Sequence, residues 1–207
     1  MRVLQTQVAR NKEFTSHGYM NIVLSLPKDL VKRVRKIAAA TAGNRKPWSA
    51  ASSSSNLELG INLGSATTSM SALEFLDTNI LVYAYDRSEP RKQQIAQGLV
   101  RRAVAGEIAA SSQVLGEFAA TLLHKLAPRA KPEDVIALLD ALGPIKLVPL
   151  DGDVILRAVQ AHAQYGLHYY HGMTVAAAER GGCQKIWSED LNAGQKYFGS
   201  AVENPFV

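Results

Sequence analysis

The 207-residue chain has little cysteine, few aromatic residues and no long apolar run. Its single cysteine, Cys183, excludes an internal disulfide and a zinc cluster built on several cysteines. The longest apolar runs, such as residues 80–84, fall far short of the ~20 residues that a bilayer requires. No apolar stretch of signal-peptide length follows Arg2. We therefore expect a soluble, cytoplasmic protein in which Cys183 is a small core residue.

Several enzyme motifs are also missing. The sequence contains no GxxxxGK phosphate loop and no GxGxxG fingerprint between a strand and a helix. It contains no GxSxG nucleophile elbow. Aromatic residues make up only 7% of the chain, and they do not alternate with basic residues as in a base-stacking surface. These absences argue against a P-loop enzyme, a dinucleotide-dependent enzyme and a serine hydrolase of the α/β type.

The positive charge is concentrated at the front of the chain. Residues 1–69 carry ten Lys and Arg against three Asp and Glu, a formal charge of +7. Residues 70–207 carry thirteen against fifteen, a formal charge of −2. A basic front end suits contact with nucleic acid, and a solvated basic tail explains the charge equally well.

The front region divides into two segments. Residues 21–26 alternate between apolar and polar as in a short strand, and residues 27–38 have the apolar spacing of a basic helix. Together, residues 20–40 resemble the first half of a ribbon-helix-helix antitoxin. Residues 41–71 are rich in Ser and Gly and predict a linker rather than the second helix that a DNA-binding module requires. Met20 and Met70 each begin a segment, which raises the hypothesis that an antitoxin reading frame has been joined to a second frame. The expected organisation is residues 1–40, the linker 41–71 and a domain over 72–207.

Residues 72–207 alternate between strand and helix patterns. We expect strands at 73–76, 107–110, 145–149 and 185–187. We expect a helix or turn at 79–85 and helices at 91–105, 113–126, 132–142, 151–165 and 170–180, with Ser112 and Asp151 as N-caps. This alternation predicts a three-layer α/β/α fold around a mainly parallel sheet.

Three acidic residues follow expected strands. Asp77 ends the first strand, Glu117 lies in the helix after the second, and Asp190 follows the strand at 185–187. If these strands are neighbours, the carboxylates converge at one sheet edge, where a hard divalent cation would bind oxygen ligands. Such a cation can activate water against a phosphodiester, which suits a nuclease. Each residue has a structural alternative, because acidic helix caps and solvated helix carboxylates are common.

Four sequence strings strengthen the catalytic interpretation. LDTNILVY at 76–83, SSQVLGEF at 111–118, YHGMTVAAA at 170–178 and WSEDL at 187–191 resemble, in order, the four motifs of PIN domains, and the closing NPF at 204–206 also suits that family. The resemblance, which covers residues 72–207, implies the ribonuclease toxin of a VapBC type II toxin–antitoxin pair. It implies Mg²⁺, or Mn²⁺, held by Asp77, Glu117 and Asp190. Supporting hydrogen bonds would come from Thr78, Asn79 and Ser188. It also implies an RNA substrate, a cognate antitoxin partner and a homodimer.

One position departs from the family pattern. His171 stands where the third motif has an aspartate. An imidazole removes a negative charge and a hard ligand, and it suits Mn²⁺ or Zn²⁺ better than Mg²⁺. Two functions remain open: an active ribonuclease toxin, or a weakened or inactive toxin homologue that acts by binding the antitoxin. Because the domain is acidic, RNA affinity would depend on the metal or on a local basic patch, for which Arg87, Arg91 and Lys92 are candidates. A DNA-binding regulator built on residues 20–40 is the third alternative.

Overall fold

The computed structural model describes residues 72–125 and 129–207. The strand and helix expected at 20–40 and the linker expected at 41–71 lie outside the described residues and stay predictions. The same holds for the joined reading frames.

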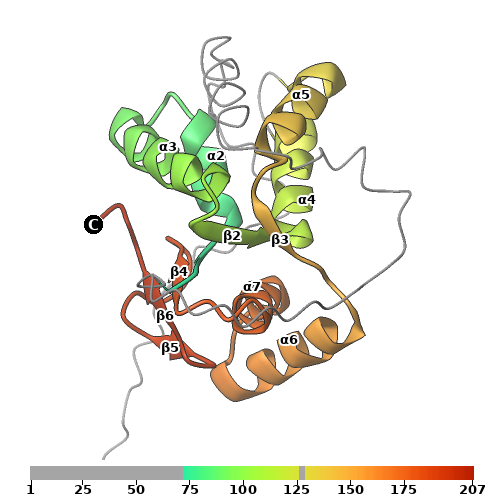
Figure 1. The fold of residues 1–207 in the computed structure, drawn as a ribbon, viewed down its shortest axis with the longest axis vertical. Helices are drawn as coiled ribbons and strands as arrows, with labels where there is room; N and C mark the ends of the chain where they lie inside the picture. The colour runs from blue at the N-terminus through green and yellow to red at the C-terminus, as the bar shows by residue number, and fades with distance from the viewer. Residues whose placement is uncertain (1–71, 126–128) are drawn as a thin grey trace, which may run out of the picture.

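A six-stranded sheet forms the centre of the domain, in the order β3-β2-β1-β4-β6-β5 (Figure 1). Every neighbouring pair is parallel except β5 and β6, which are antiparallel. The strands are β1 (Glu74–Leu76), β2 (Ile108–Ser111), β3 (Lys146–Val148), β4 (Lys185–Trp187), β5 (Lys196–Tyr197) and β6 (Ser200–Glu203). The expected fold class, a mainly parallel α/β domain, is confirmed.

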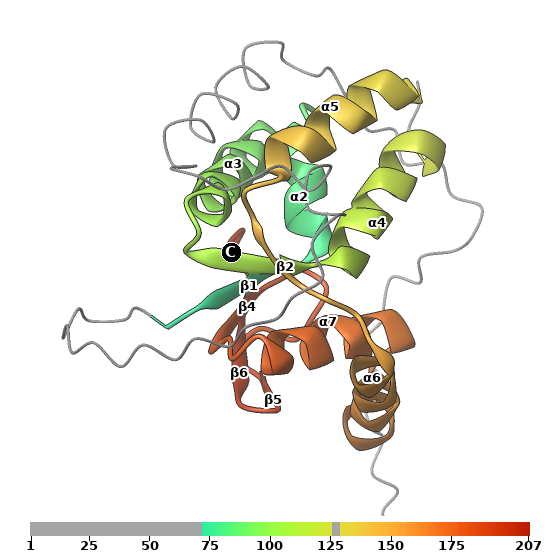
Figure 2. The same cartoon turned by 45° about the vertical axis from the view of Figure 1, so that its right-hand side comes forward.

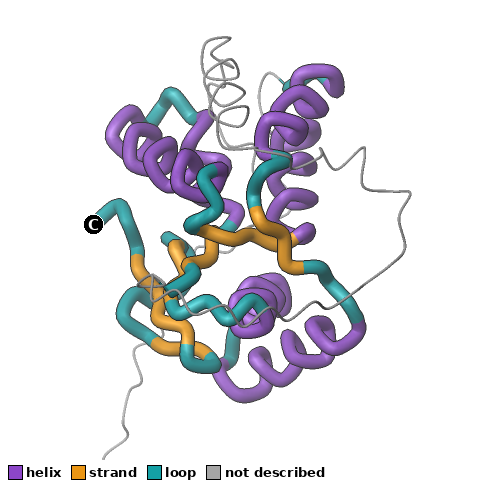
Figure 3. Tube along the Cα trace, in the orientation of Figure 1, coloured by secondary structure: helices purple, strands orange, loops and turns teal. Residues whose placement is uncertain are grey.

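Helices cover both faces of the sheet. One group lies above the strands in Figures 1 and 2: α2 (Thr78–Tyr85), α3 (Pro90–Val104), α4 (Ser112–Ala120) and α5 (Pro132–Leu142). The other group, α6 (Gly152–Tyr165) and α7 (Tyr169–Arg180), lies below them. Figure 3 shows the strands running between these two helical layers. Apolar side chains of the helices therefore pack against both faces of the sheet, which explains why β1 and β2 are buried almost throughout.

The helix boundaries follow local capping chemistry. Asp151 caps α6, because its carboxylate accepts hydrogen bonds from the backbone of Asp153 and Val154, each at 3.1 Å. Proline occupies the first turn of α3 and of α5, where its missing N–H costs nothing. Gly166 ends α6 with a φ of 68°, a conformation that favours glycine. The expected cap of α6 is confirmed.

The cap predicted for the helix after β2 was wrong. The cap is Ser111, whose Oγ accepts a hydrogen bond from Val114 N at 3.3 Å, and Ser112 is already helical. Ser111 has an extended backbone (φ −113°, ψ 164°) because β2 continues one residue further than expected. The helix predicted at 113–126 is also divided: α4 ends at Ala120 and a π-helical turn, η2, spans Thr121–Lys125.

The hairpin of β5 and β6 is absent from the sequence-based prediction. Its strands are two and four residues long, too short for an alternating pattern to register. The turn between them holds Phe198 and Gly199 at φ 48° and 92°. The hairpin extends the sheet beyond β4 and adds the antiparallel edge.

The two lower helices pack closely at a glycine. A Cβ atom on Gly172 would lie 2.6 Å from the Ala158 carbonyl oxygen of α6, closer than real Cβ contacts. The absence of a side chain thus allows α7 to approach α6. Within residues 72–125 and 129–207, no helix has the length and apolarity needed to cross a membrane.

Candidate active site

The strand order brings the three sequence-predicted carboxylates to one edge of the sheet. β1 is central and pairs with β2 on one side and β4 on the other. Asp77 directly follows β1, Glu117 lies in the second turn of α4 after β2, and Asp190 follows β4. The condition set by the sequence, that these three strands are neighbours, is therefore met.

Asp77 is buried at the start of α2, with an exposed fraction of 4%. Its Oδ1 accepts a hydrogen bond from Thr78 N at 2.8 Å and a longer one from Thr174 Oγ1 at 3.4 Å. Its Oδ2 accepts a hydrogen bond from Ser188 Oγ at 2.6 Å. Asp77 therefore caps α2 and also belongs to the site, so the structural and the functional interpretation of this residue from the sequence both hold.

Burial raises the pKa of the Asp77 carboxyl above its ordinary value, because desolvation penalises the charged form. The hydrogen bond from Ser188 and the positive charge of His171 act in the opposite direction and do not overcome it. The negative charge of Asp190 raises the pKa further. The ionised form of Asp77 is therefore destabilised by burial, and a nearby cation would stabilise it.

Asn79 connects the first carboxylate with the last. Its Nδ2 lies 3.3 Å from Asp77 Oδ2, 3.3 Å from Ser188 Oγ and 3.1 Å from Asp190 Oδ2. Its Oδ1 accepts a weak hydrogen bond from Glu189 N at 3.5 Å. One amide thus holds the residues after β1 and β4 together.

Glu117 is half-buried and connects to the same site through different residues. Its Oε2 accepts a hydrogen bond from Thr78 Oγ1 at 2.9 Å. Its Oε1 accepts one from Gln113 Nε2 at 2.8 Å. Thr78 therefore links Glu117 to the beginning of α2, next to Asp77.

His171 lies in the first turn of α7 and is half-buried. It is near enough to Asp77 for its charge to lower the pKa of that carboxyl. The position that departs from the family pattern therefore lies within electrostatic range of the buried Asp77 carboxylate.

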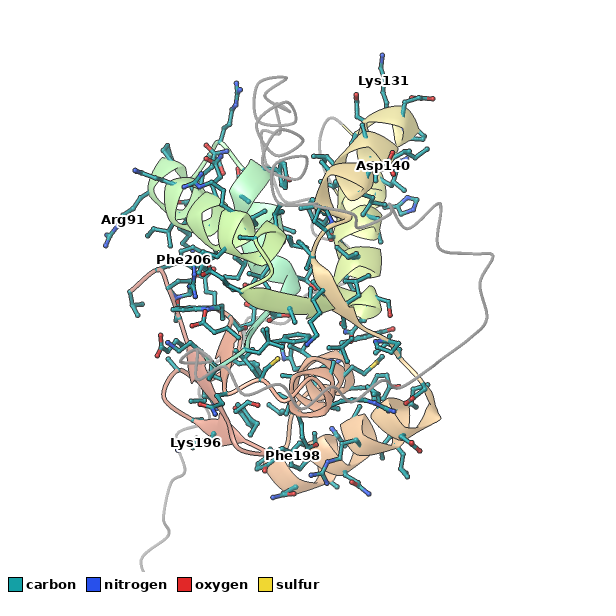
Figure 4. All side chains as sticks on the ribbon, viewed as in Figure 1. Arg91, Lys131, Asp140, Lys196, Phe198 and Phe206 are labelled. Carbon is teal, nitrogen blue, oxygen red and sulfur yellow. The ribbon has the colours of Figure 1, made fainter. Side chains whose placement is uncertain are left out.

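Lys92 stands at the margin of the site and is already paired. Its ammonium forms an ion pair with Glu189 and a 3.2 Å hydrogen bond to Tyr83 Oη. The ammonium lies 4.4 Å from the centre of the Tyr83 ring, in a cation–π arrangement. Arg87 and Arg91 are exposed, and Figure 4 shows Arg91 pointing away from α3. Lys92, one of the three basic side chains suggested by the sequence for RNA contact, is thus ion-paired with an acidic residue.

Sequence reasoning missed two contributors. Gln113 bonds to Glu117 and Thr174 bonds to Asp77. Gln113 precedes Glu117 by four residues, a spacing that places both side chains on one face of a helix and that is a signal for Gln113 in the sequence. Thr174 follows His171 by three residues in a run of small residues, and its hydroxyl has no distinguishing signal in the sequence.

The chemistry of the donor set fits a hard divalent cation. Three carboxylates follow neighbouring strands at one edge of the sheet, one of them is buried at an electrostatic cost, and the buried Gln113 Oε1 has no hydrogen-bond partner among the described residues. As the side chains lie, no three His, Cys, Asp or Glu residues in 72–125 and 129–207 are close enough together to hold one ion. Asn79 and Thr78 bridge the carboxylates instead, so ion binding would replace some of these hydrogen bonds.

Comparison with known proteins agrees with this picture. A family model described as PIN domain matches residues 75–198, more than half of the chain. The search of curated proteins returned no match.

Proposed function

Since the chain belongs to the PIN domain family, which has a nuclease-like fold and typically binds divalent metals, we propose that it is a metal-dependent endoribonuclease. The observation that carries the proposal is the hydrogen bonding of Asn79, whose single amide joins the carboxylates that follow two neighbouring parallel strands. A polar cluster at the carboxyl ends of the strands is the usual place for a site in an open parallel sheet.

The proposed roles follow from the contacts. Asp77, Glu117 and Asp190 would hold Mg²⁺ or Mn²⁺. Bound there, the cation supplies positive charge against the charge that develops on the phosphodiester oxygens during cleavage. Ser188 and Asn79 fix the orientation of Asp77 through Oδ2. Thr78 fixes Glu117 through Oε2. Exposed Arg87 and Arg91 would contact RNA phosphates.

The biological role that we propose is a type II toxin, neutralised by a cognate antitoxin and active as a homodimer. Its support is the set of four motif strings and the antitoxin-like pattern of residues 20–40. The antitoxin-like pattern lies in the basic front region, and the domain that carries the motifs is acidic.

The test is RNA cleavage by the full-length chain in Mg²⁺ and in Mn²⁺, with EDTA as the metal-free reference. We expect Asp77→Asn to lower cleavage at least about 100-fold, because the change removes the buried ligand charge and keeps the side-chain shape. Asp140→Asn, at an exposed position of α5, is the matched control and should cleave normally. Cleavage by Asp77→Asn at the natural rate would refute the site.

His171 supports a second candidate function, a weakened or inactive toxin that acts by binding the antitoxin. The histidine beside Asp77 supplies no anionic ligand. The discriminating variant is His171→Asp. Equal cleavage by both proteins would favour the active toxin, and cleavage by His171→Asp alone would favour the silenced one.

A further inference from the structure

Gln113 occupies a buried position between α4 and α7. Its exposed fraction is 8%. Its amide nitrogen donates to Glu117 Oε1 at 2.8 Å and to the Tyr170 carbonyl oxygen at 3.2 Å. Both neighbours accept hydrogen bonds only, so they determine which end of the amide is nitrogen.

The other end of the same amide is unsatisfied. With both N–H groups committed, Oε1 is buried and has no hydrogen-bond partner among the described residues. Buried side-chain oxygens are rarely left unpaired, because the lost hydration is not repaid. An amide oxygen with free lone pairs is also a ligand that hard divalent cations and their bound waters accept.

The surroundings of Gln113 indicate what would satisfy this oxygen. The amide group is hydrogen-bonded directly to Glu117, one of the three carboxylates. Its second acceptor is the backbone carbonyl of Tyr170 in the first turn of α7, the residue that immediately precedes His171. A neutral oxygen there adds an acceptor without adding a further negative charge to those of Asp77, Glu117 and Asp190.

We propose that Gln113 is an additional cation-binding residue of this site: its amide nitrogen fixes the side chain against Glu117 and α7, and its amide oxygen would supply an oxygen ligand to a divalent cation or to a water bound to it. The inference rests on the proposed metal-dependent function and adds a ligand to it. The amide oxygen of Gln113 would then be an oxygen ligand in addition to the carboxylate oxygens of the site.

The test is Mn²⁺ binding to the metal-free full-length chain, measured by titration calorimetry. Gln113→Met keeps the length of the side chain and removes its polar atoms. We expect it to weaken Mn²⁺ binding about 10-fold, as for other residues that support a metal site. Gln97→Met is the matched control, because Gln97 also donates to a backbone carbonyl, that of Ala84 at 3.1 Å, and its side-chain amide bonds to none of the three carboxylates among the described residues. Unchanged Mn²⁺ affinity in Gln113→Met would overturn the inference.

A second comparison separates a direct role from an indirect one. In a Glu117→Gln background, Gln113→Met should weaken Mn²⁺ binding further, because the amide oxygen contributes independently of Glu117. No further loss would mean that Gln113 only positions Glu117, and the inference would fail. Asp77→Asn is the independent check on the proposed function. If Asp77→Asn binds Mn²⁺ with normal affinity, the proposed metal site is wrong. If Asp77→Asn fails to bind Mn²⁺ while Gln113→Met binds it normally, only the role of Gln113 is overturned.

Discussion

The site has two parts that are built differently. The strand half consists of Asp77, Asn79, Ser188 and Asp190, which follow β1 and β4. The helix half consists of Glu117, Gln113 and His171, which lie within α4 and α7. In the strand half, Asp77 and Ser188 are 4% and 0% exposed and share a 2.6 Å hydrogen bond. In the same half Asn79 is half-buried and Asp190 is exposed. In the helix half, Gln113 is 8% exposed, and Glu117 and His171 are both half-buried.

The two parts differ not in burial but in how their side chains are positioned. Residues directly after paired parallel strands are fixed by the strand register, in which Leu76 lies opposite Trp187. Side chains projecting from helices reach the site through longer, rotatable chains, and their positions depend on packing between α4 and α7. A substitution such as histidine for aspartate is more easily accommodated in the helix half. The strand half should therefore be the sensitive part of the site.

The largest effect in this comparison should come from Ser188→Ala. The change removes the donor to Asp77 Oδ2 and leaves a buried carboxylate less satisfied. We expect Mn²⁺ affinity to fall between about 10- and 100-fold, and the free energy of unfolding to fall by about 1–3 kcal/mol. The measurements are titration calorimetry and urea unfolding.

Ser200→Ala is the control for this prediction. Ser200 is 1% exposed and its Oγ donates to the Cys183 carbonyl oxygen at 2.7 Å, away from the carboxylates. It should lower stability and leave Mn²⁺ affinity unchanged. Equal loss of affinity in the two variants would show that general destabilisation, not the bond to Asp77, controls the site.

A smaller effect is expected from Thr78→Val, which removes one of the hydrogen bonds that link α4 and α7 to the strand half. Valine keeps the branched shape and loses the hydroxyl that donates to Glu117 Oε2. We expect Mn²⁺ affinity to fall about 10-fold, the lower end for a supporting residue. Thr121→Val, in the buried first position of η2, is the matched control. If Thr78→Val has no effect, the hydrogen bond at 2.9 Å is incidental.

The buried charge of Asp77 predicts a pH dependence for the metal-free protein. Burial raises the carboxyl pKa in the folded state, so the folded chain retains this proton at pH values where the unfolded chain, with a pKa of about 3.9, has lost it. The contribution of Asp77 to stability should therefore fall as pH rises from about 4 towards the raised pKa. Asp77→Asn lacks this titration, so its free energy of unfolding relative to that of the natural chain should rise across that range. Urea unfolding in EDTA at a series of pH values measures it, and a fall across the range would contradict the assignment.

Much of the strand half could be predicted from the sequence. The apolar strings that precede Asp77 and Asp190 are short and bounded, and the alternation of strands and helices implies a parallel sheet whose carboxyl ends share one edge. What the sequence lacks is the order of the strands, on which convergence depends. The strand order shows that β1 lies between β2 and β4.

The helix half was harder to predict for physical reasons. Gln113 is polar but buried, and only the three-dimensional approach of α4 to α7 places its amide between Glu117 and Tyr170. The cap at Ser111 was missed because Ser111 and Ser112 are chemically equivalent, and only the extended backbone of Ser111 distinguishes them. The position of Gln113 depends on a tertiary contact, and the identity of the cap depends on the backbone conformation of a single residue.

The smallest expected effect concerns RNA contact at the margin of the strand half. Arg91 is exposed, whereas Lys92 is ion-paired with Glu189, next to Asp190. For a single-stranded RNA, each released counterion contributes about 0.7 to the slope of log affinity against log salt concentration. Arg91→Ala should therefore reduce the slope by about 0.7, and Lys92→Met should leave it nearly unchanged because its charge is already neutralised. Fluorescence anisotropy with a labelled RNA in EDTA measures both slopes without cleavage. Equal reductions would mean that RNA phosphates displace Glu189 from Lys92, and Lys92 would then belong to the substrate surface rather than to the support of the site.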